Sequence, residues 1–298
     1  MVEMPDVLAI LNRPSVDAPA HDPGAPPFHL ADVSLPHLSV LDLSATRGDG
    51  IFETLSVFGG RPQALEPHLD RFARSAVMLD LPTPDLGAWR QAVLAVIVQL
   101  GPMDEALVKI ILSRGVEGGE RPTGWAYASP APDFTEARTR GIRVVVLDRG
   151  LRHDVASTSP WLLAGAKTLS YAVNKAALRE AARRAADDVV FVSSDGILLE
   201  GPTSTLVYRR GDTLLTPPAH LGILEGTTQA NVFRFADGAG LQTAVEIAGP
   251  DALRSADAAW LVSSVRLAAP IRCLEGQQVP VDVELTAAMN DYLLGLPG

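Results

Sequence analysis

The chain of 298 residues contains little cysteine and little lysine. Its single cysteine, Cys273, cannot form an internal disulfide or a multi-thiolate metal site, and its six histidines show no ligand spacing such as H-E-x-x-H. The sequence therefore gives no support for a metal centre. Lys109, Lys167 and Lys175 are the only lysines among 25 basic residues, so any lysine chemistry must use one of these three positions.

Long apolar runs are also missing. The strongest ones, such as residues 93–100, fall far short of the ~20 residues that cross a bilayer, and the first residues show no basic-then-apolar signal pattern. We therefore expect a cytoplasmic protein with no membrane segment. Acidic residues outnumber basic ones by 35 to 25, so a nucleic-acid backbone would be repelled. With 47% hydrophobic residues, the composition is that of a folded globular protein.

The length suggests two domains at ~150 residues each, or one large domain. Residues 1–36 mix Pro, Asp, His and Ala without sustained periodicity, which predicts an irregular lead-in. Residues 51–58 alternate apolar and polar side chains before a Gly-Gly turn, which predicts a hairpin. The spacing of apolar residues further predicts helices over residues 65–79 and 86–100 and a buried strand over residues 107–112.

A proline-rich stretch at residues 130–133, followed by charged residues 136–140, predicts a linker. We place the domain boundary near residue 138, giving a smaller N-terminal domain over residues 1–138 and a larger C-terminal domain over residues 139–298. The second domain is rich in short strands, because strand patterns occur at residues 142–147, 189–192, 197–199 and 205–208 around a helix at residues 171–186. The fold class is α+β, two mixed domains rather than regular βαβ units.

Two residues have the chemistry of catalytic groups. Lys167 lies in a turn of small residues ahead of a helix, where desolvation would favour the neutral amine needed for a Schiff base or a proton shuttle. Glu200 ends an apolar strand at a tight turn, where its carboxylate could keep a pyridine nitrogen protonated. The alternatives are a surface lysine whose stem covers apolar area and an exposed turn glutamate.

A phosphate site is predicted where a Gly/Thr segment opens a helix. Thr227 and Thr228 would occupy the first helical turn, where free N–H groups, hydroxyls and the helix dipole favour an anion, although ordinary helix caps look the same. Arg71 could clamp the same phosphate, or be a surface arginine. A lysine, a carboxylate, a phosphate cup and an arginine together are the set that a pyridoxal phosphate site requires.

With these residues in order, the chain resembles the class IV, or fold type IV, pyridoxal phosphate enzymes. These include branched-chain and D-amino acid transaminases and aminodeoxychorismate lyase. The resemblance rests on five ordered motifs and spans most of the chain after residue 36. The motifs are residues 47–54, 68–71, 167–171, 200–204 and 222–228.

The resemblance implies a two-domain fold like that of D-amino acid aminotransferase and a role for each matching residue. Lys167 would be the Schiff-base lysine and Glu200 the partner of the pyridine nitrogen. The remaining cofactor-binding residues implied are Arg71, Tyr171, Leu224, Thr227, Thr228 and Ser264. The chain departs from the family at Thr205, Glu225, Thr227 and Gln229, where Asn, Pro, Ile and Arg are usual. The charge of Glu225 would repel a phosphate unless its side chain points outward, so these departures leave the geometry of the phosphate cup open.

The choice within the family depends on a substrate loop over residues 113–121. Its Arg-Gly and Gly-Gly-x-Arg pattern resembles that of aminodeoxychorismate lyases, with Arg114 and Arg121 as substrate-binding residues. A D-amino acid transaminase would normally carry histidine where Thr123 stands. We therefore favour conversion of 4-amino-4-deoxychorismate to 4-aminobenzoate and pyruvate, a step of folate biosynthesis.

Two other functions stay open from the sequence. The first is transamination of D-amino or branched-chain amino acids, because cofactor residues alone cannot separate the two reactions. The second is a non-catalytic scaffold on the same fold. The resemblance also implies a homodimer with two-fold symmetry, in which a loop from the second subunit completes the cofactor site and the substrate is a small amine that carries carboxylates.

Overall fold

The computed structural model describes residues 6–296 and folds as two compact units. Unit 1 holds the described residues up to Pro132, the segment Ala166–Tyr171 and Leu296. Unit 2 holds Asp133–Gly165 and Ala172–Gly295. Unit 1 therefore includes the segment that carries Lys167. A single boundary near residue 138 would assign that segment to the C-terminal domain.

Unit 1 is built on a six-stranded antiparallel sheet in the order β2-β1-β6-β5-β3-β4. The predicted hairpin is present, although its second strand has only two residues. The strands are β1 (Val7–Leu11), β2 (Phe28–Ala31), β3 (Gly50–Phe58), β4 (Arg61–Pro62), β5 (Glu105–Ser113) and β6 (Thr123–Pro130).

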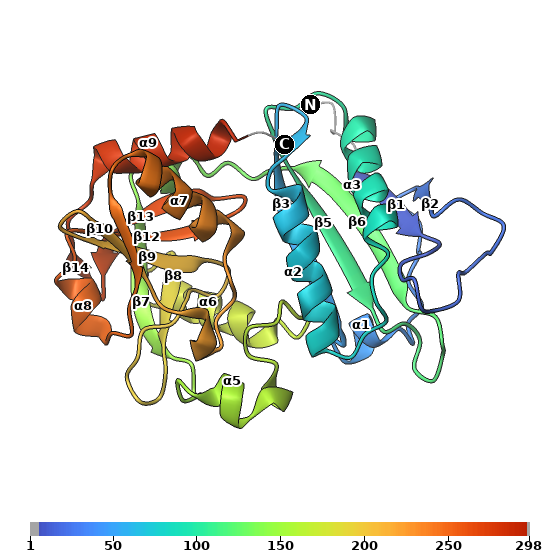
Figure 1. Ribbon diagram of the computed structural model, residues 1–298, viewed down its shortest axis with the longest axis horizontal. Coiled ribbons are helices and arrows are strands. Elements are labelled where there is room, and N and C mark those ends of the chain that lie inside the picture. The colour runs from blue at the N-terminus through green and yellow to red at the C-terminus, as the bar shows by residue number, and fades with distance from the viewer. Residues whose placement is uncertain (1–5, 297–298) are drawn as a thin grey trace. The chain divides into compact units, whose positions relative to one another are not determined.

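Helices α2 (Leu65–Met78) and α3 (Leu86–Leu100) pack on this sheet, close to the predicted ranges (Figure 1). Trp89 of α3 and Phe72 of α2 are fully buried and meet edge to face, with ring centroids 5.0 Å apart. A short helix, α1 (Leu43–Thr46), precedes β3. Burial of two such aromatic side chains stabilises the unit by several kcal/mol, at about 1.5–3 kcal/mol for each large apolar side chain.

The expectation of an irregular lead-in is wrong for part of residues 1–36, because β1 and β2 form within it. β1 is a run of five apolar residues that pairs with β6 and is largely buried. A short apolar run without alternation carries no clear period, so only the partner strand shows that it is extended. β2 covers the outer edge of β1, and residues 12–27 between them are irregular.

Unit 2 is built on an eight-stranded mixed sheet in the order β11-β10-β9-β12-β13-β7-β8, with β14 paired to β13. Its β7–β8 and β13–β7 pairs are parallel. The strands are β7 (Ile142–Asp148), β8 (Asp188–Val192), β9 (Thr205–Arg210), β10 (Thr213–Thr216), β11 (Gln242–Val245), β12 (Ala258–Ser263), β13 (Leu267–Leu274) and β14 (Gln277–Gln278).

Both faces of this sheet are covered, so neighbouring residues of one strand enter different cores. Val144 belongs to one apolar cluster, whereas Val145 joins Ala177 and Ala181 of α6 in the other. α4, α7 and α9 pack against β12 or β13 (Figure 1). The helices are α4 (Thr135–Thr139), α5 (Val155–Thr158), α6 (Ala172–Arg183), α7 (Thr227–Gly238), α8 (Pro250–Arg254) and α9 (Val283–Leu294), with 3₁₀ turns η1 (Pro160–Leu162) and η2 (Ala219–Leu221).

Two further predictions for unit 2 need correction. Most of the charged stretch expected to continue the linker is the short helix α4. The strand expected over residues 197–199 is absent as a strand, since only an isolated bridge joins Leu198 to Val192. After a turn at Gly196, where φ is +86°, the chain returns along β8, and the Leu199 N–H donates to the Phe191 carbonyl at 2.9 Å.

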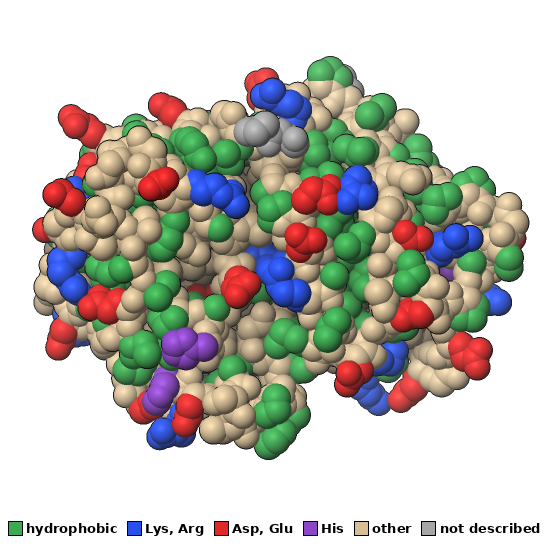
Figure 2. All heavy atoms as spheres, viewed as in Figure 1, with side chains coloured by type: hydrophobic (Ala, Val, Ile, Leu, Met, Phe, Trp, Pro, Cys, Tyr) green, Lys and Arg blue, Asp and Glu red, His purple; other side chains and the backbone are tan. Residues whose placement is uncertain are grey.

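Charged side chains of both signs are interspersed on the face seen in Figure 2, rather than gathered into a patch of one sign. None of the helices within residues 6–296 combines the length and the apolarity that a membrane crossing requires.

Candidate active site

Lys167 is fixed by backbone hydrogen bonds to the edge of the unit 1 sheet. The Phe52 N–H donates to the Lys167 carbonyl at 3.0 Å, and the Leu169 N–H donates to the Gly50 carbonyl at 2.8 Å. An isolated antiparallel bridge joins Thr168 to Ile51 between these bonds. Because β4 pairs only with the far end of β3, this stretch of edge is open to the lysine segment. The segment therefore acts as a short extra strand.

The Lys167 side chain is held against an aromatic ring. Its Nζ lies 4.6 Å from the centroid of Phe52, within the range of a cation–π contact. Tyr171 packs edge-on against the same ring, with centroids 5.4 Å apart. The Lys167 N–H also donates to Ser75 Oγ of α2 at 3.2 Å. Phe52 thus brings together two of the residues that the sequence predicts to be functional.

Arg71 lies in the middle of α2 and is buried in a charged network. Its Nε donates to Glu53 Oε1 and one terminal nitrogen donates to Glu53 Oε2, both at 2.7 Å. His68 Nδ1 lies 2.8 Å from the same Oε2. The Glu53 side chain has no exposure to solvent. A bidentate pair of this kind fixes the plane of the guanidinium as well as its distance.

Burial and the charges of this network determine the protonation states of Glu53 and His68. Burial alone would raise the pKa of Glu53, but the charge of Arg71 and the hydrogen bonds from Arg71 and His68 lower it to about 2. Burial lowers the pKa of His68, and the positive charges of Arg71 and Lys167 act in the same direction, against Glu53. At neutral pH the network therefore holds an ionised Glu53 and a neutral His68.

Glu53 was not predicted as a functional residue, although the sequence contains a signal for it. In β3, Ile51, Glu53 and Leu55 point to the same buried face. A carboxylate at an inward position of an alternating strand must find a cation, because an unpaired buried charge is costly. That cation is Arg71.

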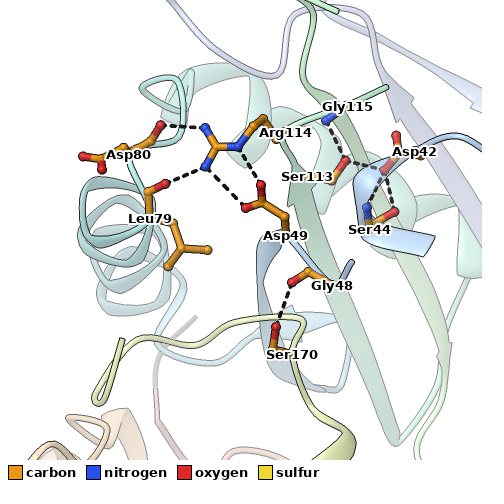
Figure 3. A network of polar contacts seen from close by, with 10 residues as sticks. All are labelled: Asp42, Ser44, Gly48, Asp49, Leu79, Asp80, Ser113, Arg114, Gly115 and Ser170. Carbon is orange, nitrogen blue, oxygen red and sulfur yellow. Dashed lines mark hydrogen bonds and ion pairs between the residues drawn. The ribbon is translucent and has the colours of Figure 1, made fainter. Parts of the chain in front are cut away.

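Arg114 and Arg121, at the two ends of the predicted substrate loop, have different surroundings. Arg114 is engaged by Asp49, with 2.7 Å from its Nε to Asp49 Oδ2, and by the carbonyls of Leu79 and Asp80 (Figure 3). Arg121 is exposed, and within residues 6–296 it forms no ion pair. Both lie in unit 1.

Glu200 lies in unit 2 at the end of the segment that follows β8. The Phe191 N–H donates to its carbonyl at 2.9 Å, which fixes the backbone. The Leu224 N–H donates to Glu200 Oε1 at 3.2 Å, which fixes the carboxylate. Glu200 and Leu224, both predicted from the sequence, are therefore in contact.

The helix predicted after Gly226 is α7, and Thr227 and Thr228 form its first turn. Gly226 is its N-cap and provides no side-chain oxygen to the free N–H groups of that turn. A Cβ at Gly226 would overlap Thr205 Oγ1, so glycine is required for this close approach. Glu225 is exposed to solvent.

Ser264 lies in the turn between β12 and β13, and two arginines brace that turn. Arg138 of α4 donates to the carbonyls of Val265 and Arg266 at 2.8 and 3.1 Å. Arg266 in turn pairs with the buried Asp188 at 2.6 Å. Neither Arg138 nor Arg266 was predicted as a site residue, because the residues that they contact are distant in sequence.

Comparison with known proteins agrees with this arrangement. The family described as amino-transferase class IV matches residues 50–274. The bifunctional aminodeoxychorismate lyase / D-amino acid transaminase of Mycobacterium tuberculosis is 46% identical over 256 residues, which cover 83% of this chain and 89% of that protein. This chain belongs to the class IV aminotransferase family.

Solved structures of class IV enzymes extend the agreement to the fold. The fold IV-transaminase CpuTA1 of Curtobacterium pusillum matches with a TM-score of 0.93 and 53% identity over 97% of each chain. A hypothetical aminotransferase of Mycobacterium tuberculosis in its PLP-bound form matches with a TM-score of 0.88 and 40% identity over 97% of this chain and 99% of that one. The two-domain α+β fold and dependence on pyridoxal phosphate, as expected from the sequence, are thereby confirmed.

Considered separately, each unit holds side chains whose chemistry suits part of this cofactor. Unit 1 provides a lysine amine on a rigid edge segment and a fixed arginine. Unit 2 provides an anchored carboxylate and a helix start whose N-cap glycine contributes no side chain. These are the groups that an aldehyde, a ring nitrogen and a phosphate each require.

Proposed function

We propose that this class IV enzyme is an aminodeoxychorismate lyase that releases 4-aminobenzoate and pyruvate from 4-amino-4-deoxychorismate. The observation that carries the proposal is the loop over residues 113–121, in which Arg121 is exposed. An exposed guanidinium is suited to bind a substrate carboxylate. The Mycobacterium tuberculosis relative at 46% identity, named for both lyase and D-amino acid transaminase activity, supports the same choice.

D-amino acid transamination is the second candidate activity. It is favoured by that same relative, which is named for both activities. The fold IV-transaminase from Curtobacterium pusillum, at 53% identity, favours transamination in general. The two reactions share the removal of a proton from the carbon that bears the amine, and they differ in where a proton is returned. One active site can therefore perform both.

We propose the following roles for the site residues. Lys167 Nζ takes the proton from the amine-bearing carbon, acting as the general base. Glu200 holds a proton at the cofactor's ring nitrogen, and Leu224, which contacts Glu200 through its N–H, packs on the ring. Pyridoxal phosphate itself supplies a ring into which the electrons of a broken bond can move.

The phosphate of the cofactor would be held by hydrogen-bond donors. We assign this role to Arg71, to Thr227 and Thr228 at the start of α7, and to Ser264 in the β12–β13 turn, and we assign Tyr171 to the neighbourhood of the cofactor. Arg71 is suited to the task because Glu53 holds its guanidinium in one plane. The helix start is suited because anions are stabilised there by about 0.3–1 kcal/mol or more.

In the lyase reaction, loss of the proton to Lys167 is followed by cleavage of the bond between the ring carbon and the enolpyruvyl oxygen. The departing group takes up a proton and becomes pyruvate, and the ring that remains is the aromatic 4-aminobenzoate. No water or oxidant is consumed. Aromatisation provides the driving force.

The decisive experiment measures both activities on one preparation of purified protein. Release of 4-aminobenzoate and pyruvate from 4-amino-4-deoxychorismate is compared with transfer of the amino group from D-alanine to 2-oxoglutarate. Lyase turnover with little transamination supports the proposal, and transamination alone overturns it in favour of the second candidate. The homodimer, tested by light scattering, and the cytoplasmic location stay predictions.

A further inference from the structure

The guanidinium of Arg114 has little capacity left for a substrate. Its Nε and one terminal nitrogen face the two oxygens of Asp49, at 2.7 and 3.3 Å. That terminal nitrogen also donates to the Leu79 carbonyl at 2.7 Å, and the other donates to the Asp80 carbonyl at 2.9 Å. Figure 3 shows the guanidinium directed at these partners. Two-point recognition of a carboxylate needs a free edge, and both usable edges are occupied.

The two carbonyls that Arg114 binds lie at the C-terminal end of helix α2. Leu79 is the C-cap of this helix, where carbonyls lack helical partners and a positive charge is favourable. The same helix carries Arg71, and Ser75, which accepts a hydrogen bond from the Lys167 N–H. Arg114 therefore ties the start of the substrate loop to the helix that contacts the lysine segment.

Asp49 extends this connection to the lysine segment by a second route. The Arg114 N–H donates to the Asp49 carbonyl at 3.2 Å, and the neighbouring Gly48 carbonyl accepts a hydrogen bond from Ser170 Oγ at 3.2 Å (Figure 3). Ser170 lies three residues after Lys167. The base of the loop and the segment of the proposed catalytic lysine are thus held by the same short stretch of chain.

A second anchor holds the residue that follows Arg114. The Gly115 N–H donates to Ser113 Oγ at 3.1 Å, and the Gly115 carbonyl accepts from the Leu43 N–H at 2.8 Å. Ser113 Oγ in turn donates to the buried Asp42 at 2.7 Å (Figure 3). Both the N–H and the carbonyl of Gly115 are therefore held by hydrogen bonds.

Gly115 also lies against the backbone of Arg121. Its φ is +92°, and a Cβ at this position would overlap the backbone carbonyl oxygen of Arg121. The two ends of the loop are therefore in close contact, which is possible because glycine has no side chain. Residues 116–121 between them are exposed.

Resting on the proposed function, we propose that Arg114 and Gly115 are positioning residues that fix Arg121, and that Arg121 is the guanidinium of this loop that binds the substrate carboxylate. Arg114 then affects substrate affinity only through Arg121. This replaces the expectation that both arginines bind substrate.

The test is a double-mutant cycle on the Michaelis constant for 4-amino-4-deoxychorismate and, separately, for D-alanine. We expect Arg121→Ala to raise KM by at least about tenfold, the loss of one charge-assisted bidentate contact. We expect Arg114→Gln to raise KM by a similar factor with a smaller change in kcat and an unchanged cofactor absorption band. In the Arg121→Ala background, Arg114→Gln should raise KM no further.

Hydrogen exchange of the loop amides provides a readout that does not depend on turnover. Arg114→Gln and Gly115→Ala should both accelerate exchange over residues 115–121, whereas Arg121→Ala should leave exchange at Gly115 unchanged. Arg61→Gln is the matched control, since Arg61 is an exposed arginine of the same unit and should alter neither quantity. Arg114→Lys keeps the charge but loses the fork, so it should rescue the loop only in part.

Three results would overturn the inference. KM increases that multiply in the double variant would mean that Arg114 contacts substrate directly. Unchanged loop exchange in both Arg114→Gln and Gly115→Ala would mean that the loop needs neither anchor. If Arg121→Ala leaves both KM values unchanged, the assignment of Arg121 as substrate ligand fails, while loop exchange still reports whether Arg114 anchors the loop. Should Arg114→Gln not fold, Arg114→Lys and Gly115→Ala carry the same comparison.

Discussion

The two units hold their proposed functional residues in different ways. In unit 1, charged partners position two of the arginines, because Glu53 fixes Arg71 and Asp49 fixes Arg114, whereas backbone hydrogen bonds hold the Lys167 segment. In unit 2, a main-chain N–H fixes the Glu200 carboxylate, and Gly226 permits the close approach of Thr205 at the start of α7. The first arrangement should be sensitive to loss of charge and to pH, and the second to added volume.

The largest effect should follow from removing the proposed base of unit 1. We expect Lys167→Ala to reduce turnover by about 10³-fold or more, since general-base catalysis alone contributes about 10²–10⁴-fold. The visible absorption band of the cofactor should also change. Lys175→Ala is the control, because Lys175 is exposed on α6. Borohydride reduction followed by peptide mapping should label Lys167, and a label on Lys109 or Lys175 would refute the assignment.

The next effect tests the carboxylate of unit 2. Glu200→Gln should retain the cofactor but lose about 10²–10³-fold in kcat, because a neutral amide stabilises a protonated ring nitrogen poorly. The Leu224 N–H can still donate to the amide oxygen, so the local fold should persist. Cofactor binding is measured by absorbance and turnover by product release. Unchanged turnover would remove this role from Glu200.

Sequence patterns predicted the helices over residues 65–79 and 86–100, which the structure has at Leu65–Met78 and Leu86–Leu100, because apolar spacing carries that information locally. The roles of the site residues stay predictions. Sequence patterns did not predict the partner of Arg71, although Glu53 stands at an inward position of an alternating strand. They also missed β1, whose extended form depends on β6, distant in the chain. In each case the structure depends on a contact with another helix or strand, which local sequence patterns do not reveal.

A third effect, on stability rather than turnover, separates a buried charge pair from an exposed one. Glu53→Gln leaves Arg71 buried without its counter-charge, so we expect a loss of about 3–5 kcal/mol in the free energy of unfolding. Glu66→Gln breaks the exposed pair with Arg90 and should cost less than about 1 kcal/mol. Urea denaturation of the two variants makes the comparison. Equal losses would show that burial of the Glu53 pair has no special weight.

A smaller effect tests volume in unit 2. Gly226→Ala places a methyl group against Thr205 Oγ1, which should cost about 1–3 kcal/mol and weaken binding of pyridoxal phosphate at the same helix start. Gly238→Ala, at the other end of α7, meets nothing within 4 Å and should change stability by less than about 1 kcal/mol. Thr205→Ala should relieve the first variant but not alter the second. Failure of this rescue would place the strain elsewhere.

The smallest effect is the pH dependence of unit 1. The pKa of Glu53 is lowered from its ordinary 4.5 to about 2, so its contribution to stability is complete above pH 4.5 and is lost as the pH falls toward 2. The pKa of His68 is lowered from 6.5 chiefly by burial, so the unfolded chain takes up a proton below pH 6.5 before the folded chain does. Both groups therefore destabilise the fold in acid, and His68 acts first.

This order can be measured by urea unfolding at pH 7, 5.5 and 4. The wild-type protein should lose stability from pH 7 to 5.5, and His68→Gln should lose less over that interval, because the substituted side chain does not titrate. His29→Gln is the control, since His29 is an exposed histidine of the same unit and its loss should leave the slope unchanged. Equal slopes in the wild type and His68→Gln would mean that the buried network does not couple folding to protonation. The sensitivity of unit 1 to charge would then be confined to its stability at neutral pH.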